Sequence, residues 1–252
     1  MAPKLAILTV TTALVAAPAA AQNAIDPGEV VPLGTWNTVL GENINGVSVR
    51  RLNGSDVNGE DGEEIGTVED IIVGPDGQVI SIIAEVGGFW DIGDQHINVP
   101  WEEVTVNADA DDNWFDTQFD VRIPVNEDNV TDFDLFGDDS DPITAGSDLT
   151  RIVDDADFEG RAWRTSELIG DFARLAGGDG EPLYHGYVYD MIIRDGEVVG
   201  TIINARYPGG YYAYPSYAGR GYGWAPGSPY YDLPYTEQDV AELQPLDAGV
   251  YD

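Results

Sequence analysis

The sequence predicts a mainly all-β protein made of two small units, each a barrel or sandwich of short strands, joined by an acidic linker. Three observations support this prediction. Short runs of β-branched residues alternate with polar residues, Asp-Gly turns connect neighbouring runs, and the same order of runs and turns occurs twice. The chain has no Cys, so burial of apolar side chains rather than disulfides must hold the fold together, and the length permits this.

The clearest hairpin lies in the first half of the chain. Apolar runs at residues 65–73 and 79–86 flank Asp76-Gly77. Asp and Gly tolerate the positive φ of a tight turn, so this pattern is a strong hairpin signal. A shorter strand is predicted at residues 96–99.

Period-two alternation predicts two further strands in the same half. Residues 43–52 place Val47 and Val49 on one face, and residues 115–125 alternate apolar with charged side chains. The first barrel is therefore assigned to residues 42–136.

The second half repeats the first and is assigned to residues 164–247. Residues 137–163, rich in Asp, Gly, Ser and Thr, are the linker. The copies lie too far apart for a solenoid, so a tandem pair of domains is predicted. The matched segments are residues 66–70 (GTVED) with 186–190 (GYVYD), Asp76-Gly77 with Asp195-Gly196, residues 44–46 with 168–170, Gly87-Gly88 with Gly209-Gly210, and residues 99–101 (VPW) with 233–235 (LPY).

The N-terminus has the pattern of a secretory signal peptide. Lys4 precedes an apolar core at residues 5–17, and small residues end at Ala21. The core is shorter than the span of about 20 residues that crosses a membrane. We expect cleavage after Ala21, a periplasmic or secreted protein without a membrane span, and a mobile leader over residues 22–41.

The formal net charge is −35, and Lys4 is the only lysine. Such a field repels nucleic acids and anionic membrane surfaces, and it attracts cations or basic partners. We therefore expect no nucleic-acid partner. An acidic surface that stays hydrated in a salty exterior is the simpler interpretation of the same charge.

Candidate chemical groups are few. His96 and His185 are the two histidines, and no cluster of further ligands accompanies either. The loop containing Asp109, Asp111 and Asn113 has alternating oxygen donors, but it lacks the Gly and Glu of a calcium loop, as does the loop from Asp56. We therefore assign no catalytic residue, cofactor or metal site, and name these three residues only as weak calcium candidates.

A Tyr-, Gly- and Pro-rich segment before the end of the second copy contains most of the 13 tyrosines. It is predicted as an insertion that breaks regular structure. Two interpretations stay open: a recognition surface for sugars or peptides, or a loop packed back on its own barrel. The candidate surface residues are Tyr211, Tyr212, Tyr214, Tyr217, Tyr222, Trp224, Tyr230 and Tyr231.

In these features the chain resembles the PRC-barrel family. Residues 166–170 (SELIG) match the opening of that family's pattern, and residues 87–93 (GGFWDIG) and 99–101 (VPW) match its later part. The resemblance implies small, mostly antiparallel barrels of roughly six strands each. It also implies docking or assembly roles without a shared catalytic residue, and the second copy matches less completely.

The sequence as a whole favours an exported, non-enzymatic binding or assembly module with an unidentified protein partner. Two alternatives remain: an acidic envelope protein that binds calcium, and a hydrolase that uses a pair of carboxylates.

Overall fold

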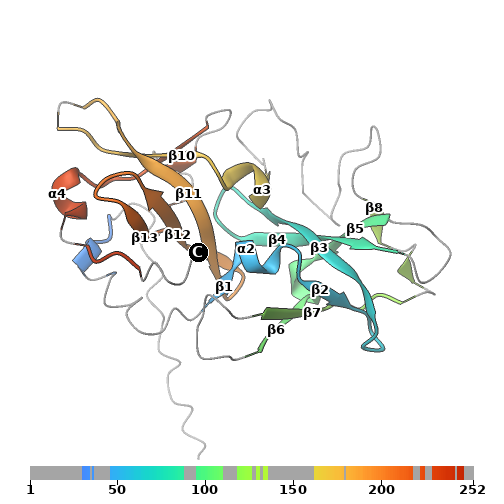
Figure 1. Cartoon of the computed structure of the whole chain (residues 1–252). Helices are drawn as coiled ribbons and strands as arrows, with labels where there is room; N and C mark the ends of the chain where they lie inside the picture. Colours follow the sequence, from blue (N-terminus) through green and yellow to red (C-terminus); the bar gives the residue numbers. More distant parts are fainter. Residues whose placement is uncertain are drawn as a thin grey trace, which may run out of the picture.

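A computed structural model describes residues 30–34, 36, 46–87, 95–109, 118–126, 129–130, 133–135, 162–178, 180–217, 222–224, 229–241 and 243–246. The fold is mostly β, as predicted, and consists of two curled sheets that lie side by side (Figure 1). Within these ranges no helix has the length and apolar character needed to cross a membrane.

We call residues 46–135 the first repeat. They supply every strand of the first sheet except β9, which comes from the second half of the chain. The strands of this sheet follow the order β6-β7-β2-β3-β4-β5-β8, and β9 pairs with β3. The elements are β1 (Val47–Ser48), α2 (Val49–Leu52), β2 (Asp56–Asn58), β3 (Glu64–Val73), β4 (Val79–Val86), β5 (Gln95–Pro100), η1 (Trp101–Glu103), β6 (Thr105–Asp109), β7 (Gln118–Arg122) and β8 (Asp134–Leu135).

We call residues 162–246 the second repeat. They supply every strand of the second sheet except β1, which comes from the first repeat. The strand order of this sheet is β13-β12-β11-β10-β15-β14, and β1 pairs with β11. The elements are β9 (Trp163–Arg164), α3 (Thr165–Leu168), β10 (Phe172–Leu175), β11 (Leu183–Arg194), β12 (Glu197–Ala205), β13 (Gly210–Pro215), β14 (Gly223–Trp224), β15 (Tyr230–Asp232) and α4 (Glu237–Val240).

Both predicted hairpins are present. β3 pairs with β4 and β11 with β12, both antiparallel. The turns use the positive φ that their sequence permits: Gly77 at 84°, and Asp195 and Gly196 at 52° and 77°. The sheets are mostly antiparallel, as expected, and the parallel pairs are β2 with β7 and β10 with β15.

The registers show which residues of the two repeats are equivalent, and they correct part of the predicted alignment. β5 pairs with β4 as β13 pairs with β12, so Pro100 is equivalent to Pro215. Pro124 is the counterpart of Pro234, because Ile123 and Leu233 make the same backbone bond to β2 and β10. The predicted match of residues 99–101 with 233–235 was therefore wrong.

The start of each repeat also differs from prediction. Residues 43–52 were expected to form a strand, but only Val47–Ser48 is extended before the helical turn α2. The equivalent turn of the second repeat is α3, and each turn is followed by a glycine at positive φ, Gly54 or Gly170. Gly170 therefore corresponds to Gly54 rather than to Gly46.

These opening segments cross between the repeats. β1 pairs with β11 of the second repeat, and β9 pairs with β3 of the first. Consequently α2 and α3 both lie between the two sheets (Figure 1). The second repeat thus begins before the predicted boundary, since Ala162 and Trp163, assigned to the linker, are buried.

A buried carboxylate secures each crossing. Asp70 of β3 accepts hydrogen bonds from the Thr165 hydroxyl at 2.8 Å and from the backbone N–H and hydroxyl of Ser166. Asp190, the equivalent residue of β11, accepts from the Ser48 hydroxyl at 2.6 Å and the Arg50 N–H at 3.0 Å. Each carboxylate therefore accepts hydrogen bonds from the hydroxyl and backbone N–H groups at the start of the helical turn that the other repeat contributes.

The two hairpin turns meet between these crossings. Val79 N–H donates to the Gly196 carbonyl at 2.8 Å, and Val198 N–H donates to the Gly77 carbonyl at 2.9 Å. One hydrophobic cluster runs through the junction, joining β3, β4 and β5 to Met191, Ile193 and Val198 of the second repeat. The two repeats therefore share part of their hydrophobic core at the junction.

The described part of the leader packs on the second repeat, so the expectation that it is mobile was wrong there. Val31 donates its N–H to the Tyr217 hydroxyl at 3.1 Å and accepts from the Tyr235 hydroxyl at 2.7 Å. Leu33 and Trp36 are each 5% exposed. We call residues 30–34 and 36 the N-terminal strap.

Small residues make room for the strap's indole. Trp36 contacts Ile192, Ile202 and Ala213 on the outer face of the second sheet. A Cβ on Gly200 would lie 3.3 Å from Trp36 Cζ2. By register, the first repeat has Ser81 and Asn98 where the second has Gly200 and Ala213.

We predict that Trp36→Ala lowers the free energy of unfolding by about 3–5 kcal/mol, because a buried indole is removed from a fitted site. Denaturant titration checks this, with the exposed Val30→Ala as control. Equal stability of the two variants would contradict the integral role of the strap.

We also predict a pH dependence at the Asp190 crossing. Burial raises the pKa of Asp190 to about 6 from 3.8, although its hydrogen bonds oppose the rise. The folded state then holds a proton that the unfolded state has lost, so stability falls as pH rises through 6. Relative to Asp190→Asn, the wild type should lose about 1.5 kcal/mol between pH 5 and pH 7.5.

Denaturant titrations of both proteins at the two pH values measure this difference, and Asp171 and His185 titrate equally in both. The prediction is wrong if the free energy of unfolding of the wild type, relative to that of Asp190→Asn, is the same at both pH values or is higher at pH 7.5.

Candidate functional site

The outer surface of the second sheet carries four exposed aromatic side chains, which we call the aromatic face: Phe172, Tyr184, Tyr187 and Tyr230. They come from the neighbouring strands β15, β10 and β11 and are between 36% and 49% exposed. Phe172 is the centre, because it pairs in register with both Tyr187 and Tyr230. Its ring lies 5.8 Å from that of Tyr184 and 6.2 Å from that of Tyr230.

Polar contacts hold the aromatic face in place. Arg174 donates two hydrogen bonds to Asp232, at 2.6 and 2.8 Å, and its guanidinium lies 3.9 Å from the centre of the Tyr230 ring. Asn204 donates to the Tyr187 hydroxyl at 2.7 Å. These contacts restrict the positions of the Tyr230 and Tyr187 rings.

The equivalent surface of the first repeat is acidic. Register places Asp56 at the position of Phe172, Thr67 at that of Tyr187, and Asp120 at that of Tyr230. Glu64 takes the position of Tyr184, and Glu85 that of Asn204. We call Asp56, Glu64, Thr67 and Asp120 the acidic face. The same fold therefore accepts either a solvated or an aromatic surface here.

Three of the eight candidate residues in the Tyr-rich segment belong to the core. Tyr212 and Tyr214 lie in β13 and Tyr231 in β15, and all three are at most 3% exposed. They are therefore unavailable to a partner. The strand β13 also contradicts the expectation that this segment breaks regular structure.

The other predicted tyrosines have mixed roles. Tyr211 is half-buried against the ring of Tyr189, and Tyr217 binds the strap. Tyr222 is exposed but contacts only the Tyr217 ring among the described aromatic residues. Trp224 is half-buried and packs on Tyr231. Of the eight candidates, Tyr230 alone lies in the aromatic face.

A network of hydroxyls joins the buried tyrosines. Tyr217 and Tyr235 share a hydrogen bond of 2.6 Å, while Tyr231 accepts from the Thr201 hydroxyl and the Tyr217 N–H, each at 3.2 Å. Burial raises the pKa of Tyr214, Tyr231 and Tyr235 above the ordinary value, so these phenols stay neutral. The network is a structural support.

Both histidines have structural partners. His96 bonds to Glu69 through Nδ1, and the equivalent positions of the second repeat hold the Tyr211–Tyr189 ring pair. His185 is buried and lies 2.8 Å from the Tyr214 hydroxyl. Burial lowers the pKa of His185 to about 4, so it is neutral at pH 7.

The calcium candidates cannot be placed in full. Asp111, Asn113 and the Asp109 side chain lie outside the described residues. Among the residues that are described, no group of three or more His, Cys, Asp or Glu is arranged to hold a metal ion.

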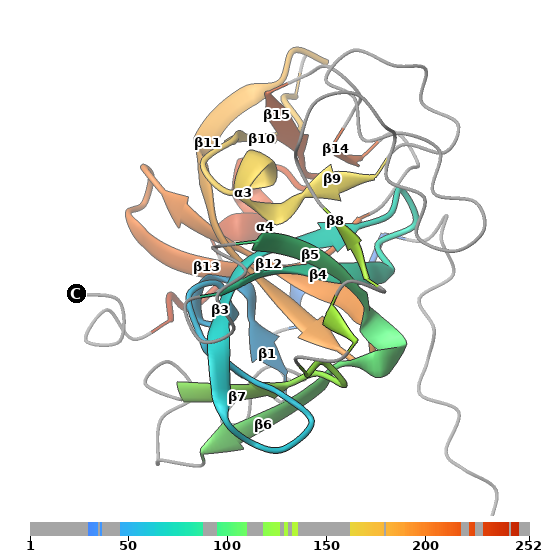
Figure 2. The same cartoon turned by 90° about the vertical axis from the view of Figure 1, so that its right-hand side faces the viewer.

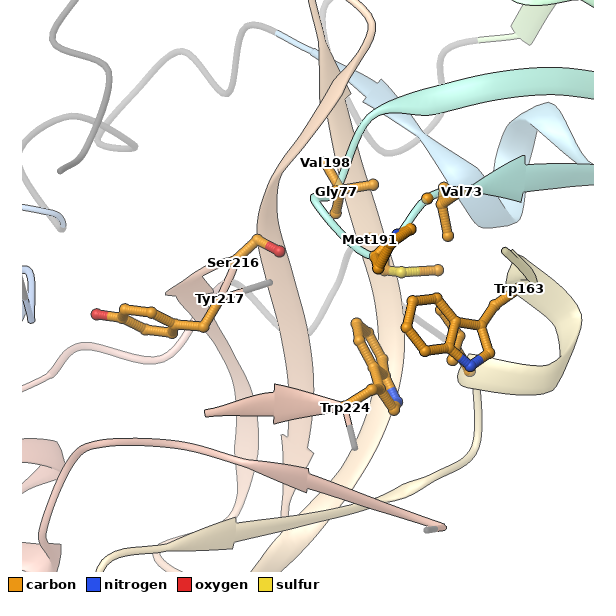
Figure 3. Close-up of a pocket in the computed structure, with 11 residues that line it drawn as sticks. Val73, Gly77, Trp163, Met191, Val198, Ser216, Tyr217 and Trp224 are labelled. Atoms are coloured by element: carbon orange, nitrogen blue, oxygen red, sulfur yellow. The ribbon is translucent and has the colours of Figure 1, made fainter. Parts of the chain in front are cut away.

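An apolar pocket lies where the two hairpins meet (Figure 3). Trp163 and Trp224 form one side, and Val73, Met191 and Val198 lie around it. Its volume of about 20 Å³ accommodates roughly one water molecule. It is therefore a packing defect at the junction and too small to admit an organic ligand.

Sequence reasoning missed Phe172, Tyr184 and Tyr187. The signal was present in one matched segment, because GTVED of the first repeat becomes GYVYD in the second. This change places a tyrosine at residue 187, on the outward side of β11. An alignment corrected by register extends the same comparison to Phe172 and Tyr184.

The sequence profile of the PRC-barrel domain matches residues 44–121. The match starts just before β1 and ends within β7, so it covers most of the first repeat. A comparison with curated proteins finds no match to the chain. The likeness of the second repeat to the first rests on its topology and register.

Proposed function

We propose that this protein is an exported, non-enzymatic binding or assembly module built of two PRC-barrel-like repeats. In this proposal the aromatic face is the surface that binds a protein partner, and the first repeat is a scaffold. The observation that carries the proposal is the contrast between two equivalent surfaces of one chain. The first repeat shows that the fold needs no aromatic residue at these positions, so their presence in the second calls for another reason.

The physical properties of the aromatic face fit a binding role. Tyr and Phe provide a large contact area at a low cost in side-chain entropy, and such residues dominate the energetics of many interfaces. Contiguous exposed apolar side chains on an otherwise highly charged protein are typical of an interaction site. The PRC-barrel match over the first repeat also supports a role in binding or assembly.

Export is supported by the N-terminal pattern. The strap begins at residue 30, downstream of the predicted cleavage after Ala21, so cleavage leaves it intact. The acidic composition also suits a protein that must stay soluble outside the cytoplasm.

We predict that replacing the aromatic face by the residues of the acidic face abolishes partner binding and keeps the fold. The variant is Phe172→Asp, Tyr184→Glu, Tyr187→Thr and Tyr230→Asp. The immobilised wild type and variant would be exposed to cell-envelope extract, and the retained proteins identified by mass spectrometry. At least one protein should bind the wild type and lose more than tenfold of its signal on the variant.

A Tyr207→Ser, Tyr222→Ser variant is the matched control, because both side chains are exposed and lie outside the aromatic face. It should retain the same proteins as the wild type. The proposal fails if all three proteins retain the same set at equal levels while their circular dichroism spectra agree.

A further inference from the structure

We propose that the aromatic face binds a basic protein segment by stacking its arginine side chains on the exposed rings. This inference rests on the proposed function and adds the chemistry of the partner. It follows from the charge of the chain, the contacts that the chain makes with its own arginines, and the composition of the aromatic face.

The charge of the chain selects the sign of the partner. The sequence carries a formal charge of −35, so its field attracts cationic molecules over distances longer than a contact. A second copy of this chain would bring an equal negative charge to the face. A basic partner is drawn towards the face, whereas a second copy is repelled from it.

The chain's own arginines show that tyrosine rings of the second sheet accept a guanidinium. The Arg174 guanidinium lies 3.9 Å from the Tyr230 ring centre, and that of Arg50 lies 4.2 Å from the Tyr189 ring centre. A guanidinium stacks on an aromatic ring through its flat face while its edge keeps donors for hydrogen bonds. Tyrosine rings on this sheet therefore already contact arginine in the geometry that the proposal requires.

The aromatic face offers room for more such contacts. Asp232 neutralises Arg174, so that side chain adds little repulsion against an incoming cation. Phe172, Tyr184 and Tyr187 are between 39% and 49% exposed. The rings supply stacking at short range, while the acidic remainder of the chain supplies attraction at long range.

The test uses a twelve-residue peptide of alternating Arg and Ser, and a second peptide with Lys in place of Arg. Binding to the full chain is measured by calorimetry in 150 mM salt, where weak surface attraction is largely screened. The wild type should bind the Arg peptide at least tenfold more tightly than the Lys peptide, because the planar guanidinium stacks better than an ammonium.

Two variants separate stacking from charge. The Phe172→Asp, Tyr184→Glu, Tyr187→Thr, Tyr230→Asp variant adds negative charge, so attraction by charge alone would strengthen its binding. The proposal predicts instead a loss of at least tenfold for the Arg peptide. A neutral variant, Phe172→Ser, Tyr184→Ser, Tyr187→Thr, Tyr230→Ser, should lose a similar factor, and the Tyr207→Ser, Tyr222→Ser control should bind as the wild type does.

Three outcomes would overturn the inference. The first is Arg-peptide binding by the acidic variant as tight as that of the wild type. The second is binding of a neutral oligosaccharide such as maltohexaose, abolished by the neutral variant, without binding of the Arg peptide. The third is a wild-type dimer in sedimentation that becomes a monomer in the neutral variant. If envelope proteins are lost from the variant but the Arg peptide does not bind, the proposed function stands and this inference falls.

Discussion

Two buried carboxylates, Asp70 and Asp190, hold the structure together at its centre. Each lies on the long central strand of one repeat and accepts hydrogen bonds from the helical turn that the other repeat contributes. An unpaired carboxylate or helix end would be costly to bury, so each crossing requires the other repeat in place. The meeting of the hairpin turns and the common core follow from this exchange.

This exchange explains how the two repeats can share a fold and still carry different outer surfaces. Residues that face the junction must pack against the other repeat and hydrogen-bond to it. Outward-facing residues of β10 and β11 make no such contacts with the described residues of the other repeat's core, so their identity is less restricted. Figure 2, a view at 90° to Figure 1, shows α3 and β9 lying against the strands of both repeats. The outer surface is therefore acidic in one repeat and aromatic in the other without loss of the fold.

Sequence patterns predicted the hairpins, because period-two alternation and Asp-Gly turns are local signals. The crossings were not predictable in this way. Val47–Ser48 pairs with residues far along the chain, and its short strand leads at once into a helical turn. The strap was missed for a similar reason: Trp36 is isolated in sequence, and its site exists only after β11, β12 and β13 have come together.

The candidate site was predictable only in part. Abundance of tyrosine drew attention to residues 211–231, yet Tyr212, Tyr214 and Tyr231 face the core, because strand alternation decides burial regardless of composition. Phe172 and Tyr184 gave no local signal, since an exposed aromatic residue and a core residue look alike in a strand. The contrast with Asp56 and Glu64 became visible only through the registers.

Native-state hydrogen exchange of Asp70→Ala tests the central claim that the repeats form one cooperative unit. Asp70 lies in the first repeat, but it secures α3 of the second. The account predicts that amides of β11 and β12 lose as much protection as those of β3 and β4. Loss of protection confined to β3 and β4, with β11 and β12 unchanged from the wild type, would contradict it.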